Sequence, residues 1–285
     1  MLYKGRRQSS NVEDRRGLST GKKIGIRGGL LGVVGIIIYV LLGGDPQMAL
    51  SFLQFDSGQT ESSTEYQPTP HEEELAEFVS VVLADTEDVW HKLFNEMGMQ
   101  YREPKLVLFS GKVNSACGFS SSATGPFYCP GDDRVYIDLL FLEQLQQRLG
   151  AQGDFAIAYI IAHEVGHHVQ NLFGTLEEMN SLSQQVSQKQ YSELTVRLEL
   201  QADFFAGIWA HHAQKMKNIL EKGDIEEAMN AAQAVGDDRI QMQSQGYVVP
   251  DSFTHGTSAQ RMSWFKKGFT TGDIRNGNTF DQNAI

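Results

Sequence analysis

Residues 154–174 read DFAIAYIIAHEVGHHVQNLFG. Asp154 can cap a helix here, the apolar run FAIAYIIA suits a core position, and Gly174 can end the helix. The helix contains His163-Glu164-Val165-Gly166-His167, a match to H-E-x-x-H. Residues four apart on a helix differ by about 40° in direction, so both imidazoles can bind one metal ion. The sequence therefore predicts a metal-binding helix in the core.

The H-E-x-x-H pattern predicts zinc as the metal and Glu164 as the general base. Zinc lowers the pKa of a bound water towards about 7, and a carboxylate beside the first histidine can take its proton. Three solvated polar residues on a helix flank are the alternative, but burying such a face without a metal would be costly. Further histidines are interpreted as neighbours or surface residues: His168, His211 and His212.

The third protein ligand is expected from a second helix at residues 192–220, SELTVRLELQADFFAGIWAHHAQKMKNIL. Glu199 and Asp203 lie four apart on one face, where two carboxylates repel unless each has a partner. Glu199 on zinc and Asp203 accepting the outer N–H of a ligand imidazole, here His163, would satisfy both. The alternative is a solvated acidic edge. It is disfavoured because the neighbouring residues place this turn in a core: Phe204, Phe205, Ile208 and Trp209.

A loop near the C-terminus supplies candidates for stabilising a developing oxyanion. Thr257 and Gln260 form a capping box that opens a helix, and His255 lies just before it. Zinc peptidases commonly add a His, Tyr or Arg that donates to the oxyanion. His255 is the first candidate and Arg261 the second; the alternative is a loop histidine and a helix-surface arginine.

The remaining chain predicts an α+β fold, a mainly helical zincin-like domain with a small sheet over residues 69–275. A Thr69–Glu72 capping box opens a long helix whose apolar stripe stops before Gly98. Other expected elements are strands at KLVLF (105–109) and RVYID (134–138), a helix at 139–149, two short helices before Gly246, and a tail at 276–285.

Cys117 and Cys129 lie 12 positions apart in turn-rich sequence. In an oxidising compartment such a pair is expected to form a disulfide. Closing so short a loop would contribute about 2–3 kcal/mol on a chain-entropy basis. The alternatives are two buried free thiols, or soft metal ligands with two further partners.

Charge is unevenly distributed along the 285 residues, whose net charge is −11. Residues 1–27 carry eight Lys and Arg against two acidic residues, so this basic arm is +6 and the rest of the chain −17. The acidic body argues against a nucleic-acid binder. Residues 28–44, GGLLGVVGIIIYVLLGG, are uncharged and predict one transmembrane anchor, followed by a linker at 45–68.

The orientation of this anchor follows from the basic arm before it. Because Lys and Arg favour the cytoplasmic side, the N-terminus is expected in the cytoplasm and the domain outside it. A cleavable signal peptide is one alternative, although no A-x-A site follows the apolar run. A buried core helix is the other.

Five motifs in order resemble the bacterial neutral zinc metallopeptidase family, a gluzincin-like group: ACGFSSSATGPFYCP, VYIDLLFLEQL, IAHEVGHHVQNLFG, RLELQADFFAGIWAH and DSFTHGTSAQRMSWFKKGF. The resemblance covers roughly residues 70–275 and also the N-terminal arm and anchor. It supports zinc and hydrolysis better than any substrate.

The function predicted is that of an endopeptidase anchored in a bacterial inner membrane, with one zinc ion per chain, acting on a peptide or protein. Glu164 would activate the water and pass its proton to the leaving amine. Two alternatives are a zinc-stabilised binding or scaffold module without turnover, and an amidase acting on a cell-wall bond. The sequence indicates neither an oligomeric state nor a physiological partner.

Overall fold

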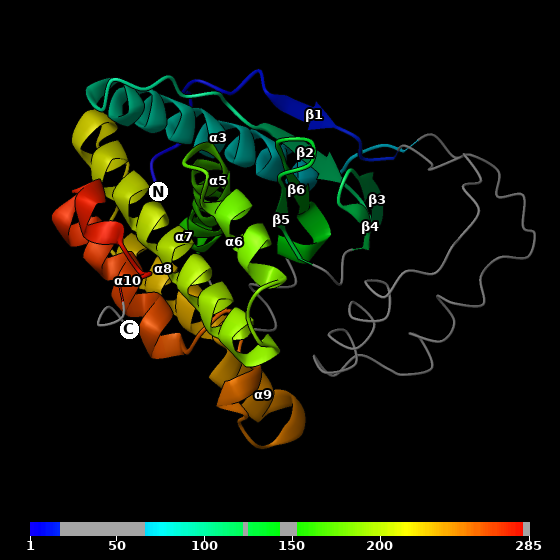
Figure 1. The fold of residues 1–285 in the computed structure, drawn as a ribbon. Helices are drawn as coiled ribbons and strands as arrows, with labels where there is room; N and C mark the ends of the chain where they lie inside the picture. The colour runs from blue at the N-terminus through cyan, green and yellow to red at the C-terminus, as the bar shows by residue number, and fades with distance from the viewer. Residues whose placement is uncertain (18–65, 122–124, 143–152, 282–285) are drawn as a thin grey trace, which may run out of the picture.

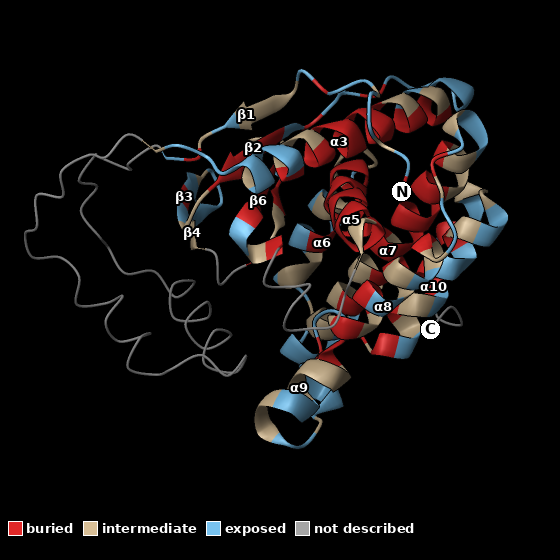
Figure 2. Cartoon of the chain, turned by 180° about the vertical axis from the view of Figure 1, so that it is seen from behind, coloured by how far each residue is buried: buried red, intermediate tan, exposed pale blue. Residues whose placement is uncertain are grey.

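Helix α5 (Asp154–Leu172) runs through the middle of the molecule in the computed structural model, which describes residues 1–17, 66–121, 125–142 and 153–281 (Figure 1). Every residue from Phe155 to Gly166 is buried, and Figure 2 shows α5 enclosed by the other elements. This burial follows from the sequence FAIAYIIA, which gives the first half of the helix no polar face. The predicted core helix is confirmed.

Three helices enclose α5 on the side of the C-terminal half of the chain. They are α7 (Gln188–Lys217), α8 (Asp224–Ala234) and α10 (Ser258–Thr271). The capping boxes predicted at Thr257 and at Thr69 are both present. α7 and α10 cross at two glycines, and a Cβ at either Gly207 or Gly268 would overlap the backbone of the opposite helix. The crossing therefore brings the two backbones closer than side chains would allow.

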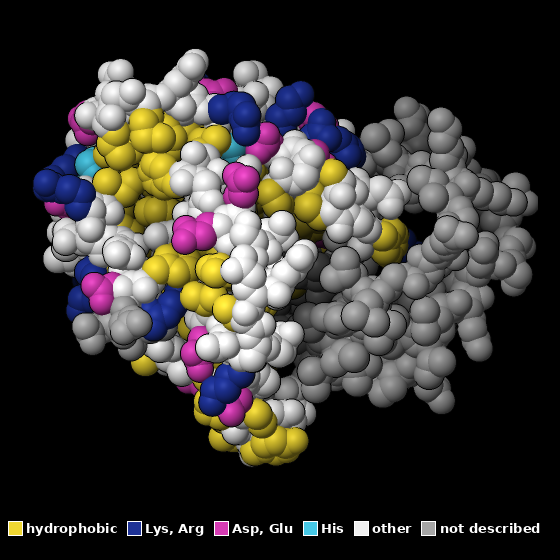
Figure 3. All heavy atoms as spheres, in the orientation of Figure 1, with side chains coloured by type: hydrophobic (Ala, Val, Ile, Leu, Met, Phe, Trp, Pro, Cys, Tyr) yellow, Lys and Arg dark blue, Asp and Glu magenta, His cyan; other side chains and the backbone are white. Residues whose placement is uncertain are grey.

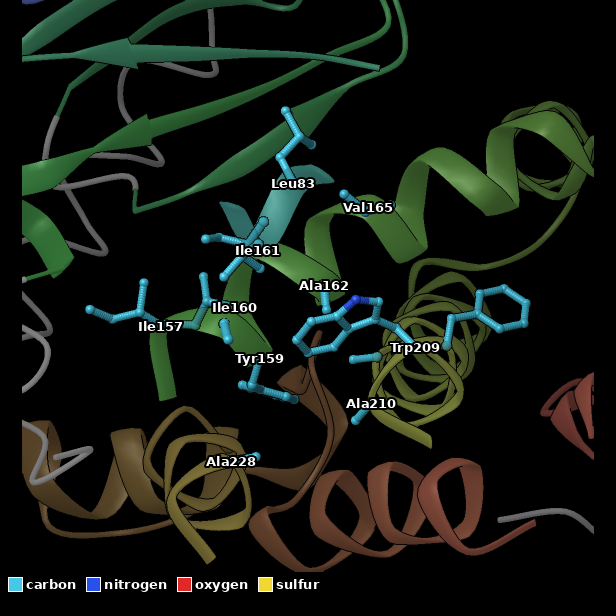
Figure 4. Close-up of a cluster of buried hydrophobic side chains, with 14 of the residues drawn as sticks. Leu83, Ile157, Tyr159, Ile160, Ile161, Ala162, Val165, Trp209, Ala210 and Ala228 are labelled. Atoms are coloured by element: carbon cyan, nitrogen blue, oxygen red, sulfur yellow. The ribbon is translucent and has the colours of Figure 1, made fainter. Parts of the chain in front are cut away.

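The long helix α3 (Pro70–Glu96) covers another side of α5. Figure 4 shows the packing in this region: Leu83 of α3, apolar side chains of α5 and Trp209 of α7 lie together in one core. Trp209 is fully buried and stacks on Phe155 with ring centroids 5.7 Å apart. Large aromatic side chains thus hold α7 against α5, which fixes the relative placement of residues on these two helices.

A four-stranded sheet packs beside the helices in the order β1-β2-β6-β5. The two strands predicted from sequence, β2 (Lys105–Phe109) and β6 (Arg134–Asp138), are parallel neighbours. β5 (Phe127–Cys129) is antiparallel to β6 at one edge, and β1 (Val12–Asp14) is parallel to β2 at the other. The predicted mainly helical α+β fold with a small sheet is confirmed.

A separate hairpin carries the cysteine pair. It is formed by β3 (Lys112–Ser115) and β4 (Gly118–Ser121). The predicted disulfide between Cys117 and Cys129 is present and ties the hairpin turn to the edge strand β5. Cys129 is fully buried beside Tyr136 and Val113, so the bond is anchored in a small second core.

The other helices agree in part with expectation. Two short helices before Gly246 are α8 and α9 (Asp237–Gln245), as predicted. The helix expected at 139–149 is helical at 139–142, and its remainder lies outside the described residues. Elements that the sequence did not indicate are α6 (Thr175–Ser183), η2 (Pro250–Ser252) and η3 (Ile274–Gly277).

Helix α9 projects from the body of the molecule (Figures 1 and 2). Figure 3 shows hydrophobic side chains at its tip, where Met242, Tyr247 and Val249 are exposed. At its other end α9 begins with the buried Asp237, which contacts the loop before α10. The projection is therefore joined to the region of His255.

The structure differs from the expected domain organisation at both ends of the chain. Residues 1–17 were expected to belong to a separate basic arm, but β1 is a strand of the domain's own sheet and Arg6 pairs with the buried Asp85. The tail predicted from residue 276 also packs on the domain, because the fully buried Thr279 donates to the carbonyl oxygen of Arg197. In both cases long-range pairing gives order to polar sequence that has no periodicity.

Within the described residues no helix is long and apolar enough to cross a membrane. The predicted anchor at 28–44 and nearly all of the predicted linker lie outside the described residues. The anchor therefore stays a prediction.

Candidate metal centre

Three side chains from two helices bring their ligand atoms together. His163 and His167 lie one turn apart on α5, and Glu199 faces them from α7. The Nε2 atom of His163 lies 3.2 Å from one Glu199 carboxylate oxygen, and the Nε2 atom of His167 lies 3.5 Å from the other. All three ligand atoms lie within 4.8 Å of one another. The structure therefore assembles the three residues predicted as metal ligands.

The spacing of these atoms fits a zinc ion. With Zn–N and Zn–O bonds of 2.0–2.1 Å in a tetrahedron, neighbouring ligand atoms lie about 3.3 Å apart. The two nitrogen–oxygen distances, 3.2 and 3.5 Å, lie on either side of that value. Two imidazoles and one carboxylate also leave a fourth position for water, which is the ligand set of catalytic zinc sites.

Asp203 orients the first imidazole, as the sequence predicted. Its Oδ1 atom lies 2.8 Å from Nδ1 of His163, which leaves Nε2 directed towards Glu199. The same oxygen accepts a hydrogen bond from the hydroxyl of Tyr159, one turn earlier on α5. Asp203 is completely buried, so its position is fixed by these partners and not by solvent.

Arg261, the second candidate for an oxyanion donor, is engaged with Asp203. Its guanidinium is buried and binds both oxygens of Asp203, at 2.8 and 2.9 Å, on the side away from Glu199. Further N–H groups reach the Tyr159 hydroxyl and the carbonyl of Val235. With its donors engaged in this way, Arg261 acts on the site through Asp203. It is a positioning residue.

Gln170 orients the second imidazole, and the sequence analysis missed it. Its side-chain oxygen lies 2.8 Å from Nδ1 of His167, three residues earlier on the same helix. The amide nitrogen of Gln170 donates to the carbonyl oxygen of Leu198 on α7, at 2.7 Å. Gln170 thus fixes the ring of one ligand and ties it to the residue preceding the third. The sequence could have indicated this contact, because residues three positions apart meet on the surface of a helix.

A glycine inside the motif allows α7 to come close enough. A Cβ at Gly166 would lie 3.0 Å from the carbonyl oxygen of Ala202 and 3.2 Å from its Cα atom. Both atoms belong to backbone and cannot rotate away. Gly166 therefore sets the separation of α5 and α7 at the level of the metal ligands.

Glu164 is buried but unpaired. Its side chain is 8% exposed, and no hydrogen bond or ion pair joins its carboxylate to another residue in the described part of the chain. A carboxylate at low exposure without a protein hydrogen-bond partner is suited to hold a water molecule. The structure thus leaves Glu164 available for the role of base that the sequence predicted.

His255 lies on the loop before α10, on the same side of the site as Glu199. Burial raises the pKa of Glu199, but the positive charges of His167 and His255 outweigh it and lower that pKa well below its usual value. The His255 side chain is 48% exposed, so it can reach a ligand from solvent. This placement agrees with a donor to substrate.

Asp237 builds the loop that holds His255, and the sequence analysis missed it too. One of its oxygens accepts the backbone N–H groups of three consecutive residues, Thr254, His255 and Gly256. The other oxygen lies 3.3 Å from Nδ1 of His255. Asp237 lies 18 residues earlier in the chain, at the start of α9, so no local pattern linked the two.

The other histidines predicted to be outside the ligand set lie elsewhere. His168 is fully buried between the Tyr128 hydroxyl and the carbonyl of Arg102, where it joins β5 to α5. His211 and His212 are half-buried and contact backbone carbonyls at the end of α10. They are more enclosed than the surface position expected, because α10 ends against them.

Charged side chains on α5 and α7 shift one another's pKa values at this site. Burial lowers the pKa of His163, but Asp203 and Glu199 on either side of its ring outweigh this and raise it to about 10. Burial raises the pKa of Asp203, and Arg261 and His163 reverse this and lower it to about 2. The buried Asp203 and the largely enclosed Glu199 thus require positive charge between them, from protons or from a metal ion.

A second group of carboxylates lies at the start of α5. Asp154, Asp224 and Glu227 have oxygens close enough for a metal. The amino group of Met1 lies 2.6 Å from Asp154 and 3.5 Å from Asp224, so this acidic group has a cation beside it already. We assign no metal there.

Two histidines of an H-E-x-x-H helix, a glutamate from a second helix and an aspartate behind the first histidine define the site of a zinc-peptidase-type protein. The sequence profile of the family described as "Putative neutral zinc metallopeptidase" matches residues 1–280. The chain belongs to this family. Because the match begins at residue 1, it includes the segment that the structure packs onto the sheet.

The chain is also similar to curated proteins of other bacteria. "Uncharacterized protein YpfJ" of Escherichia coli (strain K12) is 50% identical over 288 residues, which cover 98% of this chain and 99% of the relative. "Uncharacterized protein Rv2575" of Mycobacterium tuberculosis (strain ATCC 25618 / H37Rv) is 44% identical over 190 residues, 63% of each chain. No solved structure gives a significant match.

Proposed function

We propose that this protein is a zinc-dependent endopeptidase. The observation that carries the proposal is the convergence of His163, His167 and Glu199 at tetrahedral spacing beside the buried, unpaired Glu164. When bound, zinc would polarise the scissile carbonyl and lower the pKa of the attacking water. The two histidine ligands are each held by a partner, His163 by Asp203 and His167 by Gln170, so their rings are preorganised for this task.

Proton transfer falls to Glu164. Its carboxylate takes a proton from the water as the water attacks, and then delivers it to the nitrogen of the leaving amine. His255 donates to the carbonyl oxygen while negative charge develops there. Asp237 keeps the imidazole of His255 in place through the loop backbone. Asp203 and Arg261 hold His163 from behind and do not contact substrate.

The edge strand β5 is the proposed binding surface for an extended peptide. It is the outer strand of the described sheet, antiparallel to β6, and it packs on α5. An extended substrate can add to such an edge through its backbone, so binding would depend little on side-chain identity. The Tyr128 hydroxyl, near His168 and Asn171, fixes the strand to the metal-bearing helix.

The site of action proposed is a membrane surface in an oxidising compartment. The uncharged run 28–44 supports an anchor, and the disulfide between Cys117 and Cys129 supports a location outside the cytoplasm. The bacterial inner membrane, facing away from the cytoplasm, meets both conditions.

The experiment supplies the purified chain with a mixed peptide library and, in parallel, with peptidoglycan fragments. Hydrolysis of peptides that stops on chelation and returns with zinc supports the proposal. Cleavage of cell-wall fragments alone would replace it with a cell-wall amidase. Stoichiometric zinc with no cleavage of either would make the domain a zinc-stabilised binding module.

A further inference from the structure

The segment 1–17 is built into the domain through backbone pairing. β1 lies parallel to β2, with Val12 beside Leu106 and Asp14 beside Leu108. The amide of Leu106 donates to the carbonyl oxygen of Asn11 at 2.9 Å, and the amide of Arg15 donates to that of Leu108 at 2.8 Å. The segment therefore completes the sheet on the side opposite β5.

Side chains of the segment neutralise buried carboxylates on α3. Glu87 is 2% exposed, and its oxygens accept from Arg7 at 2.9 Å, from Asn11 at 2.9 Å and from the hydroxyl of Ser9. All three partners belong to residues 1–17. Removal of the segment would break these hydrogen bonds to Glu87. The segment and the domain are therefore joined by polar side-chain contacts as well as by the sheet.

The point where the segment ends is also fixed. Arg16 is almost fully buried and binds Glu73 at 2.9 Å and the carbonyl of Glu72 at 3.2 Å, in the first turn of α3. Gly17 adjoins Tyr66, so closely that a Cβ on the glycine would overlap the tyrosine. The chain therefore leaves the domain at residue 17 and re-enters it at residue 66 beside the same spot (Figure 1).

We propose that residues 1–17 and the zinc-site domain lie on the same side of the membrane. The hydrocarbon core of a bilayer is about 30 Å thick, so two residues in contact cannot lie on opposite faces of it. The expected orientation, with the N-terminus in the cytoplasm and the domain outside, is incompatible with this docking in one chain. This inference rests on the membrane location proposed above, and it excludes a single crossing of the bilayer between residues 17 and 66.

Cysteine labelling of the full chain in membranes tests this. Ser10→Cys reports on the segment and Ser181→Cys on the domain; both serines are exposed, and the two natural cysteines are paired. A membrane-impermeant maleimide is applied to spheroplasts before and after permeabilisation, with the parent chain as control. We expect both variants to be labelled under the same condition. Labelling of one before permeabilisation and of the other only afterwards would overturn the proposal.

Hydrogen exchange on the purified, unmodified full chain is the second measurement, and it does not depend on a substitution. The amide of Arg15 donates to the carbonyl oxygen of Leu108 on β2, so peptides covering 11–16 should exchange about 100-fold more slowly than an unstructured peptide. Exchange at the unstructured rate would show that the segment is undocked and would remove the basis of the proposal. Neither measurement depends on catalytic activity.

Discussion

Glu199 and Asp203 are one turn apart on α7, and the structure gives them different tasks. Glu199 faces both imidazoles, whereas Asp203 lies behind His163 and is bound by Arg261. Both are enclosed, but only Glu199 has its oxygens at zinc-ligand spacing from two histidine nitrogens. The position of each carboxylate therefore decides whether it binds the metal or orients a ligand. Substitutions of Glu199 and Asp203 should have different effects on zinc affinity.

Alanine at a metal ligand should abolish stoichiometric zinc, because each change removes one of three protein ligands. The variants are His163→Ala, His167→Ala and Glu199→Ala. Asp203→Asn keeps the shape of the side chain and should weaken zinc about 10–100-fold without abolishing it. Competition with a chromophoric chelator measures both effects. Wild-type affinity in Glu199→Ala would disprove the assignment of the third ligand.

Substitutions at Arg261 and at His255, the two candidate donors from sequence, should differ in how much they lower the free energy of unfolding. Arg261→Ala leaves Asp203 buried without its cation and should lower the free energy of unfolding by about 3–5 kcal/mol. His255→Ala removes a half-exposed side chain and should change it by less than about 1 kcal/mol, while lowering hydrolysis about 10²–10³-fold. Urea unfolding of the metal-free variants gives the comparison. Equal stability losses would contradict the separate roles.

The residues of the metal centre that could be predicted from sequence are those that lie close together in the chain. His163 and His167 are four apart, as are Glu199 and Asp203, and one helix turn relates each pair. The links that could not be predicted are long-range: Arg261 is 58 residues from Asp203, and Asp237 is 18 residues from His255. Sequence alone showed that Arg261 could donate but not to what.

At the scale of elements, the glycines of α7 and α10 decide how closely the helices cross. Gly207→Ala should push α10 away from α7 and lower the free energy of unfolding by about 1–3 kcal/mol, through overpacking against backbone. Lys215→Ala, at an exposed position of the same helix, is the control and should change it by less than about 0.5 kcal/mol. Thermal unfolding compares the two. Similar stability for both variants would mean that the crossing relaxes freely.

Helices were predicted better than strands. Capping boxes at Thr69 and Thr257 and long apolar stripes mark helix starts and faces within the sequence itself. β1 and β5 have three residues each, too few for an alternating pattern to appear. Arg6 and Arg7 gave the impression of a solvated arm, because their carboxylate partners Asp85 and Glu87 lie 79 and 80 positions away on α3.

At the scale of the whole molecule, the buried charges predict how stability follows pH. Burial of the His163 ring lowers its pKa, but Asp203 and Glu199 outweigh this and raise it to about 10. In the unfolded chain the pKa of a histidine is near 6.5. Protonated His163 thus stabilises the metal-free protein fully below pH 6.5, and this contribution is lost as pH rises towards 10. Zinc replaces the proton and needs the neutral ring.

The melting temperatures of zinc-loaded and chelated protein should therefore diverge as pH rises from 6.5 to 10. Differential scanning calorimetry across that range gives both series under matched ionic strength. His163→Ala, in which neither proton nor zinc is held at this position, is the control and should show no such divergence. A gap that stays constant with pH in the parent protein would contradict the charge coupling at His163.

The central claim is that zinc is held by His163, His167 and Glu199 and that Glu164 uses it. Glu164→Gln keeps the shape of the side chain and a hydrogen-bonding group but removes the base. Metal content and peptide hydrolysis are measured on the same preparations of parent and variant. We predict one zinc ion per chain in both, with hydrolysis lowered about 10²–10⁴-fold in the variant. A variant that binds zinc and still hydrolyses peptides at the parent rate would contradict the account.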